Sequence, residues 1–118
     1  MALMARSTDD RGECVRWYLH LRVSEELGRA VPLREVARRT GIAAPQLSLL
    51  VKHGTSGGLV MLIRYAEGTG RTPGALLDEA LRWWEKSGRE YAETALYEIA
   101  QRRATPKSTR KPSIPAAG

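Results

Sequence analysis

The basic residues give the clearest indication of what this chain binds, and they are unevenly distributed along it. The 118 residues carry a net charge of +6. Residues 29–71 hold seven basic and two acidic residues, and residues 101–118 hold five basic and no acidic residues, so each segment has a net charge of +5. Cationic groups concentrated in this way attract polyanions. The charge pattern therefore favours a polyanion as partner over a general contribution to solubility.

The residue types that perform nucleophilic or acid–base catalysis are scarce. The chain has two histidines, His20 and His53, and a single cysteine, Cys14. No Ser-His-Asp arrangement and no His/Cys metal site can be assembled from so few groups. The glycine-rich stretches "GTSGG" and "GTG" lack the following Lys-Ser/Thr pair of a phosphate-binding loop. We therefore expect no enzyme activity, no catalytic residue, no metal and no cofactor. His20 is expected at a surface or half-buried position of the first helix, and His53 at the C-terminal end of a helix, where the dipole favours it.

The same sequence favours a cytoplasmic location. It contains no apolar stretch of about 18 residues, which a transmembrane helix requires. Its first 14 residues, "MALMARSTDDRGEC", lack the apolar region of a secretory signal. A lone Cys14 cannot form an intramolecular disulfide, which fits a reducing compartment.

The spacing of apolar residues predicts an all-α chain. Apolar residues recur at helical spacing from about Asp10 to Leu27, and Gly28 is a stop signal. Prolines, which favour the first helical turn, and glycines, which favour the left-handed residue after the last, delimit the helices that follow. These are expected at about residues 32–40, 45–53, 59–66, 72–86 and 89–103. Their expected core positions include Val36, Ala37, Leu47, either Leu50 or Val51, Leu59, Leu62, Ile63 and Ala66.

The two shortest of these helices, at about residues 32–40 and 45–53, are separated by a tight turn. Gly41 is expected in the left-handed conformation, where a side chain would clash. Ala37 is small where the two helices cross, and Ile42 and Leu47 fill the space between them. Two short helices joined in this way form a helix-turn-helix unit.

Around this unit, "LREVARRTGIAAPQLSLLVKHG" followed by "LVMLIRYAEGTGRTPGALL" resembles the DNA-binding domain of phage repressors, the lambda-repressor-like or Xre (Cro/C1-type) family. The resemblance covers about residues 15–82. The matching positions are Val36, Ala37, Gly41, Ile42, Leu47, Ser48, Leu50, Gly54, Leu62, Ala66, Gly70 and Leu76. The resemblance implies a five-helix helix-turn-helix domain over residues 10–87. It also implies a bacterial or phage transcriptional regulator that binds double-stranded DNA and is nucleoid-associated when bound.

The resemblance further implies which residues contact DNA. The recognition helix of such a unit, here about residues 44–53, lies in the major groove with its N-terminal side chains at the base edges. Base contacts are therefore expected from Ala44, Pro45, Gln46, Ser48 and Leu49. Contacts to phosphates, which position a protein without reading sequence, are expected from Arg34, Arg38, Arg39, Lys52, Thr55 and Ser56.

Departures from the family pattern leave a second function open. Leu33 stands where many members have glutamine, and Ala43 replaces the usual polar residue before the recognition helix. The apolar start of that helix disfavours sequence readout, whereas the charge of residues 29–71 favours DNA. The alternative is a protein-interaction module, such as an antitoxin-like or regulatory partner, that keeps the fold but binds DNA weakly.

Residues 88–104 form an additional helix outside the five-helix core. It either packs back onto its own domain or forms a homodimer contact. Trp84 lies on the apolar stripe of the preceding helix and Trp83 does not, so Trp83 is expected to be exposed. The candidates for a dimer contact are Trp83, Tyr91, Leu96 and Ile99. We expect residues 1–9 to be flexible, and residues 105–118, a basic segment with three prolines, to be disordered.

Overall fold

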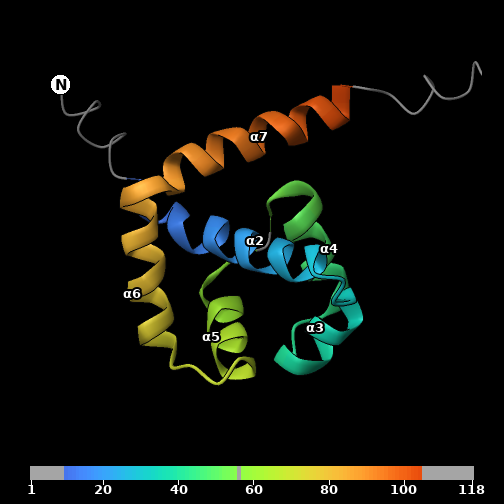
Figure 1. The fold of residues 1–118 in the computed structure, drawn as a ribbon, viewed down its shortest axis with the longest axis vertical. Helices are drawn as coiled ribbons and strands as arrows, with labels where there is room; N and C mark the ends of the chain where they lie inside the picture. Colours follow the sequence, from blue (N-terminus) through green and yellow to red (C-terminus); the bar gives the residue numbers. More distant parts are fainter. Residues whose placement is uncertain (1–9, 56, 105–118) are drawn as a thin grey trace, which may run out of the picture.

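The computed structural model describes residues 10–55 and 57–104, and within them it is all helical (Figure 1). The expected flexible N-terminus, the expected basic tail and Ser56 lie outside the described residues. No strand occurs in the described part of the chain, which confirms the all-α prediction. The helices are α2 (Glu13–Gly28), α3 (Leu33–Thr40), α4 (Ala44–His53), α5 (Leu59–Gly68), α6 (Pro73–Trp83), the π-helical turn η1 (Trp84–Gly88) and α7 (Arg89–Ala104).

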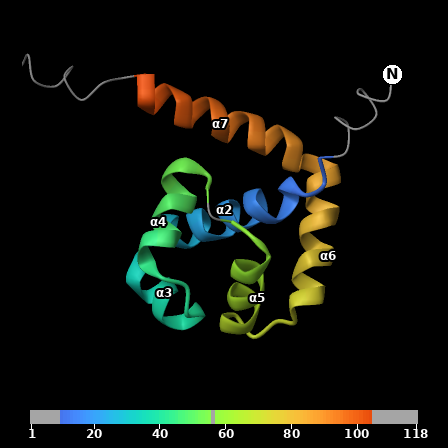
Figure 2. The ribbon, with the colours of Figure 1, turned by 180° about the vertical axis from the view of Figure 1, so that it is seen from behind.

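Helix α2 is the central element of the fold. It contacts α4, α5, α6 and η1, and both ribbon views show it crossing the middle of the molecule (Figures 1 and 2). Helices α3 and α4 lie at one end of α2, α6 lies at the other, and α7 runs along one side. Trp17, Leu19 and Val23 are buried, so α2 provides the apolar surface against which the other helices are positioned.

The local signals for helix ends are confirmed. Gly41 and Gly54 follow α3 and α4 with φ angles of 76° and 69°, in the left-handed region that glycine adopts without steric cost. The hydroxyl of Thr72 accepts a hydrogen bond of 3.2 Å from the Ala75 amide and caps α6. Proline and glycine positions therefore determine the ends of these helices through interactions within a few residues.

The expected buried face of α5 is wrong in part. Leu62 and Ala66 are buried as expected, but Leu59 is 59% exposed. Met61 and Tyr65 are buried instead, on the side of the helix that faces the rest of the core. The segment "LVMLIRYA" is apolar on nearly every side, so its spacing alone does not distinguish the buried face from the exposed one.

The connection between α6 and α7 also differs from expectation. The π-helical turn η1 joins the two helices, and Trp84 on it is buried as predicted. Trp83 is half-buried rather than exposed, because its ring packs 5.2 Å from the ring of Tyr18 and 5.5 Å from that of Tyr91. A Cβ atom on the buried Gly88 would lie 2.6 Å from the Trp84 ring. Glycine therefore permits the close aromatic packing at this turn.

Helix α7 buries one face against its own chain. Ala92, Ala95 and Ile99 are buried in the common core, and Tyr91 is half-buried against it. Leu96, which was expected on the same apolar stripe, is 50% exposed. Of the four dimer candidates, Leu96 is thus the one whose side chain is largely accessible.

None of the described helices is long and apolar enough to cross a membrane.

Candidate nucleic-acid interface

The turn between α3 and α4 is held by side chains at both of its ends. The Thr40 hydroxyl donates to the Val36 carbonyl at 2.7 Å and accepts from the Ile42 amide at 3.2 Å. On the outer side, Nη1 of Arg64 on α5 donates to the Gly41 carbonyl at 2.9 Å. These contacts satisfy polar groups that the tight turn leaves outside the helical ladder. They therefore fix the direction in which α4 leaves α3.

The expected base-contact residues lie on α4 with unequal exposure. Pro45, Gln46 and Leu49 are exposed, whereas Ala44 and Ser48 are half-buried. Between them, Leu47 and Leu50 are fully buried and anchor the helix. Because residues three and four apart share a face of a helix, Gln46 and Leu49 lie on the same outward side.

Helix α4 begins without a side-chain cap. Ala43 is the N-cap residue in an extended conformation, and no side chain accepts a hydrogen bond from the first turn. The amides of Gln46 and Leu47 bond to the Ala43 carbonyl instead. This end of the helix carries the positive end of its dipole.

The expected phosphate-contact residues fall into two groups. Arg34 and Lys52 are exposed and form no ion pair with the described residues. Arg38 pairs with Glu35 one turn away at 2.5 Å, but its side chain is 71% exposed. Thr55 is exposed and donates its hydroxyl proton to the Leu49 carbonyl at 3.4 Å. Arg34, Arg38 and Lys52 are therefore available at the surface, because exposed ion pairs are weak.

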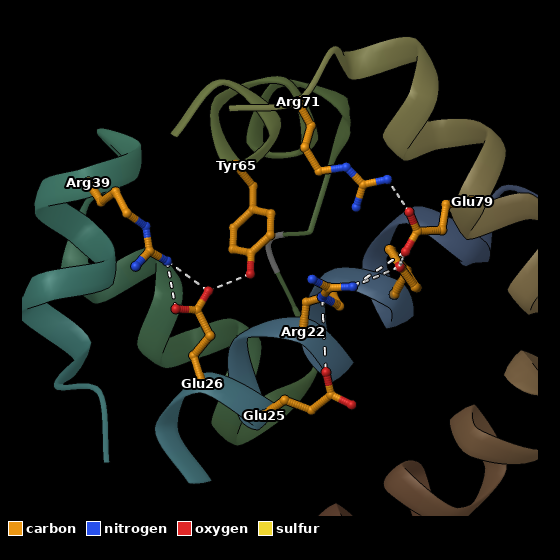
Figure 3. Close-up of polar contacts among 8 residues, drawn as sticks. Arg22, Glu25, Glu26, Arg39, Tyr65, Arg71 and Glu79 are labelled. Carbon is orange, nitrogen blue, oxygen red and sulfur yellow. Dashed lines mark hydrogen bonds and ion pairs between the residues drawn. The ribbon is translucent and has the colours of Figure 1, made fainter. Parts of the chain in front are cut away.

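Arg39 differs from these residues because it is held inside the domain. Its side chain is 30% exposed, and Nη2 donates to both carboxylate oxygens of Glu26 on α2, at 2.6 and 2.7 Å. Tyr65 on α5 donates its hydroxyl proton to the same carboxylate at 2.5 Å (Figure 3). The sequence did not indicate this cluster, since Glu26, Arg39 and Tyr65 come from three different helices.

Ionisation in this cluster follows from its geometry. Burial acts to raise the pKa of Glu26, but the hydrogen bonds from Tyr65 and Arg39 outweigh it and hold that pKa below its usual value. Burial and the adjacent carboxylate raise the pKa of Tyr65 to about 12. Glu26 is thus ionised and Tyr65 neutral at neutral pH, which is the state in which all three groups are paired.

A second polar cluster joins α2 to α6. Glu79 on α6 accepts hydrogen bonds from Tyr18 and Arg71, and Nη1 of Arg22 lies 3.4 Å from the same carboxylate (Figure 3). The positive charge of Arg71 is therefore compensated within the domain. With Arg39 paired as well, the accessible positive charge of residues 29–71 belongs to the remaining basic side chains, among them Arg34, Lys52 and Arg64.

The last carbonyls of α4 receive donors from outside the helix. Nη1 of Arg16 on α2 donates to the Gly54 carbonyl at 3.1 Å, and Nη2 of Arg102 on α7 donates to the Lys52 carbonyl at 2.9 Å. Nε2 of His20 on α2 lies 3.2 Å from the Val51 carbonyl. His20 is buried, which corrects the expectation of a surface or half-buried position.

A groove of about 480 Å³ lies beside the start of α4. Its lining comes from the turn before α4, from Gln46 and from the first residues of α5. Leu59 and Val60 line it and are 59% and 64% exposed. Among the described residues that line it, Arg64 is the one that carries a charge. The groove thus places the apolar side chains of Leu59 and Val60 beside the exposed face of α4.

Metal-binding geometry does not occur among the described residues, where no group of three His, Cys, Asp or Glu side chains lies close enough to hold an ion.

Comparison with protein-family models, with curated proteins and with solved structures found no match to this chain. The interpretation of the interface therefore depends on the geometry and charge of the chain itself.

Proposed function

We propose that this protein is a DNA-binding regulator of the lambda-repressor-like type, in which α3 and α4 form a helix-turn-helix unit and α4 enters the major groove. The observation that carries the proposal is the arrangement of α4. Leu47 and Leu50 anchor it in the core, and the pinned turn at Gly41 fixes its direction. Gln46 and Leu49 remain exposed on its outward side. A rigid helix that presents such side chains suits the readout of base edges.

The exposed side chains favour A·T base pairs. The amide of Gln46 matches the donor and acceptor of adenine in the major groove, and Leu49 offers an apolar contact to a thymine methyl group. Arg34, Arg38 and Lys52 supply sequence-independent contacts to phosphates. Arg39 is not among the proposed contacts, because its guanidinium is paired with Glu26.

Selection of bound sequences from a random pool of duplex DNA tests the proposal. We expect an enriched motif containing an A·T pair, and an affinity that falls steeply between about 50 and 200 mM salt because counterions are released. The double substitution of Arg34 and Lys52 by alanine is expected to lower the salt dependence. Substitution of Arg82, an exposed arginine on α6, is the control, because α6 lies away from α3 and α4 (Figure 1). Absence of binding at low salt would exclude the DNA-binding function.

The alternative function is a protein-interaction module, and the groove beside α4 favours it. Exposed neighbouring aliphatic side chains such as Leu59 and Val60 are unusual on a surface that contacts only phosphates. A photo-crosslinking residue at position 60 tests this alternative in the native cell. A single trapped protein at position 60, with none trapped at position 82, combined with no enriched DNA motif, would favour the protein-interaction module.

A further inference from the structure

The outer face of α7 is not covered by any other helix of the described part of the chain. Ala92, Ala95 and Ile99 bury the inner face in the core, and neither ribbon view shows a helix on the side of α7 that points away from α2 (Figures 1 and 2). The side chains of Leu96 and Tyr97 are 50% and 65% exposed. Tyrosine beside an aliphatic side chain is a combination that is enriched where proteins contact one another.

This pair lies at the middle of the helix, between neighbours at helical spacing. Helix α7 has 16 residues, Arg89–Ala104, so its midpoint falls between Leu96 and Tyr97. Glu93 lies three and four residues before the pair, and Ala100 lies four and three residues after it, which places all four on adjoining parts of one exposed face. Because the side chain of Ala100 is small, a second helix can approach this face closely.

The charged side chains around the pair are divided between the two ends of α7. Glu90 and Glu93 lie in its first half and Arg103 lies in its last turn. All three are exposed and form no ion pair with the described residues, whereas Arg89 is paired with Asp10. A helix that is acidic near its start and basic at its end is complementary to an antiparallel copy of itself. A parallel copy would bring like charges together.

We propose that the exposed face of α7 binds a second copy of this chain, with the two α7 helices antiparallel and related by a two-fold axis at the midpoint of the helix. Leu96 then packs against Leu96 of the second copy, and Glu93 of each copy pairs with Arg103 of the other. A two-fold dimer requires a patch that is complementary to itself, which the order of apolar and charged residues on α7 provides. One helix from each copy buries a small area, so the association is reversible.

The dimer has a consequence for DNA that rests on the proposed function. The two-fold axis relates the two α4 helices, so a selected DNA motif is expected to contain an inverted repeat of the half-site. The association of the two copies does not depend on DNA and is measured without it. Dimerisation without any DNA binding would therefore contradict the proposed function alone.

Sedimentation equilibrium of the full chain, between about 5 µM and about 1 mM, tests the dimer directly. We expect a monomer–dimer equilibrium that weakens at high salt, because salt screens the ion pairs of Glu93 with Arg103. Leu96→Glu places two like charges at the two-fold axis and is expected to weaken dimerisation by about 10-fold or more. Leu59→Glu is the matched control, since Leu59 is an equally accessible leucine on α5.

Two results of this experiment would overturn the proposal. The first is a monomeric wild type at every concentration, which would leave the face of α7 to another protein or to another segment of the chain. The second is a larger loss of dimerisation in Leu59→Glu than in Leu96→Glu, which would place the contact at the groove beside α4.

A charge-reversal experiment tests the antiparallel arrangement. Glu93→Arg alone places two cations opposite each other, and Arg103→Glu alone places two anions there, so each variant is expected to dimerise about 5-fold or more weakly than the wild type. An equimolar mixture of the two variants restores both ion pairs and is expected to form a mixed dimer. Both positions are exposed, so the helical circular dichroism of each variant is expected to be unchanged. A mixture that associates no more strongly than either variant alone would overturn the proposed arrangement.

Discussion

Nη2 of Arg39 on α3 donates to both carboxylate oxygens of Glu26 on α2, at 2.6 and 2.7 Å. Tyr65 on α5 donates to the same carboxylate. One buried carboxylate therefore ties together the central helix, the helix that precedes the proposed recognition helix, and α5. Such a cluster orients α3 without contributing to the exposed face of α4.

Arg39→Ala is expected to destabilise the protein by about 2–3 kcal/mol, because it leaves the buried Glu26 carboxylate without its cation. The matched control is Arg38→Ala, one residue earlier on the same helix. Its exposed pair with Glu35 is expected to contribute less than about 1 kcal/mol. Urea unfolding of both variants measures the difference. Equal losses would mean that the Glu26 cluster contributes no more than a surface ion pair.

Acidification is expected to weaken the same cluster. The pKa of Glu26 is lower in the folded chain than its ordinary value of 4.5, so the ionised carboxylate stabilises the fold above that pH. This contribution is lost as the pH falls through the folded pKa. Urea unfolding of Glu26→Gln between pH 6 and pH 3 is expected to show a weaker pH dependence than the wild type. Glu67→Gln, at an exposed position of α5, is expected to retain the wild-type dependence; if it does not, the acid effect is a general loss of charge.

Gly54→Ala is expected to destabilise the protein more than Gly70→Ala. Both glycines have left-handed φ angles, 69° and 77°, so each alanine costs about 1–2 kcal/mol in backbone strain. At Gly54 the new Cβ would also lie 2.5 Å from the Trp17 ring, whereas at Gly70 nothing lies within 4 Å. The added overpacking is expected to cost about 1–3 kcal/mol more. Thermal unfolding of the two variants tests this, and similar midpoints would show that Trp17 moves aside freely.

Gln46→Ala is expected to reduce base discrimination, because it removes the one exposed side chain at the start of α4 with both a donor and an acceptor. The loss should affect one base pair of the selected motif, by about 1–3 kcal/mol. Arg34→Ala is the control and is expected to weaken binding to all sequences about equally and to lower the salt slope by about 1. Affinities for a panel of single-base variants of the motif measure both effects. An unchanged ranking in Gln46→Ala would exclude this residue as a reader of bases.

The amino-acid sequence determined the helical class and most helix ends. Pro73, Thr72, Gly41 and Gly54 act through hydrogen bonds and backbone angles of their immediate neighbours. Such local interactions are readable from a short segment of sequence. On α4 the sequence indicated Leu47 as a core residue but left Leu50 and Val51 as alternatives, and the structure buries Leu50 and half-buries Val51.

Only the tertiary structure decided which polar groups are buried and which face of an apolar helix is exposed. Glu26 meets Tyr65 across 39 residues, and His20 meets Tyr91 across 71. The burial of each depends on a partner that its own segment does not contain. Leu59 is exposed for the same reason, since the position of α5 against α6 and α2 selects its inner face. Local sequence patterns cannot predict which face or polar group is buried, because the free energy of burial depends on surfaces that meet only when the chain is folded.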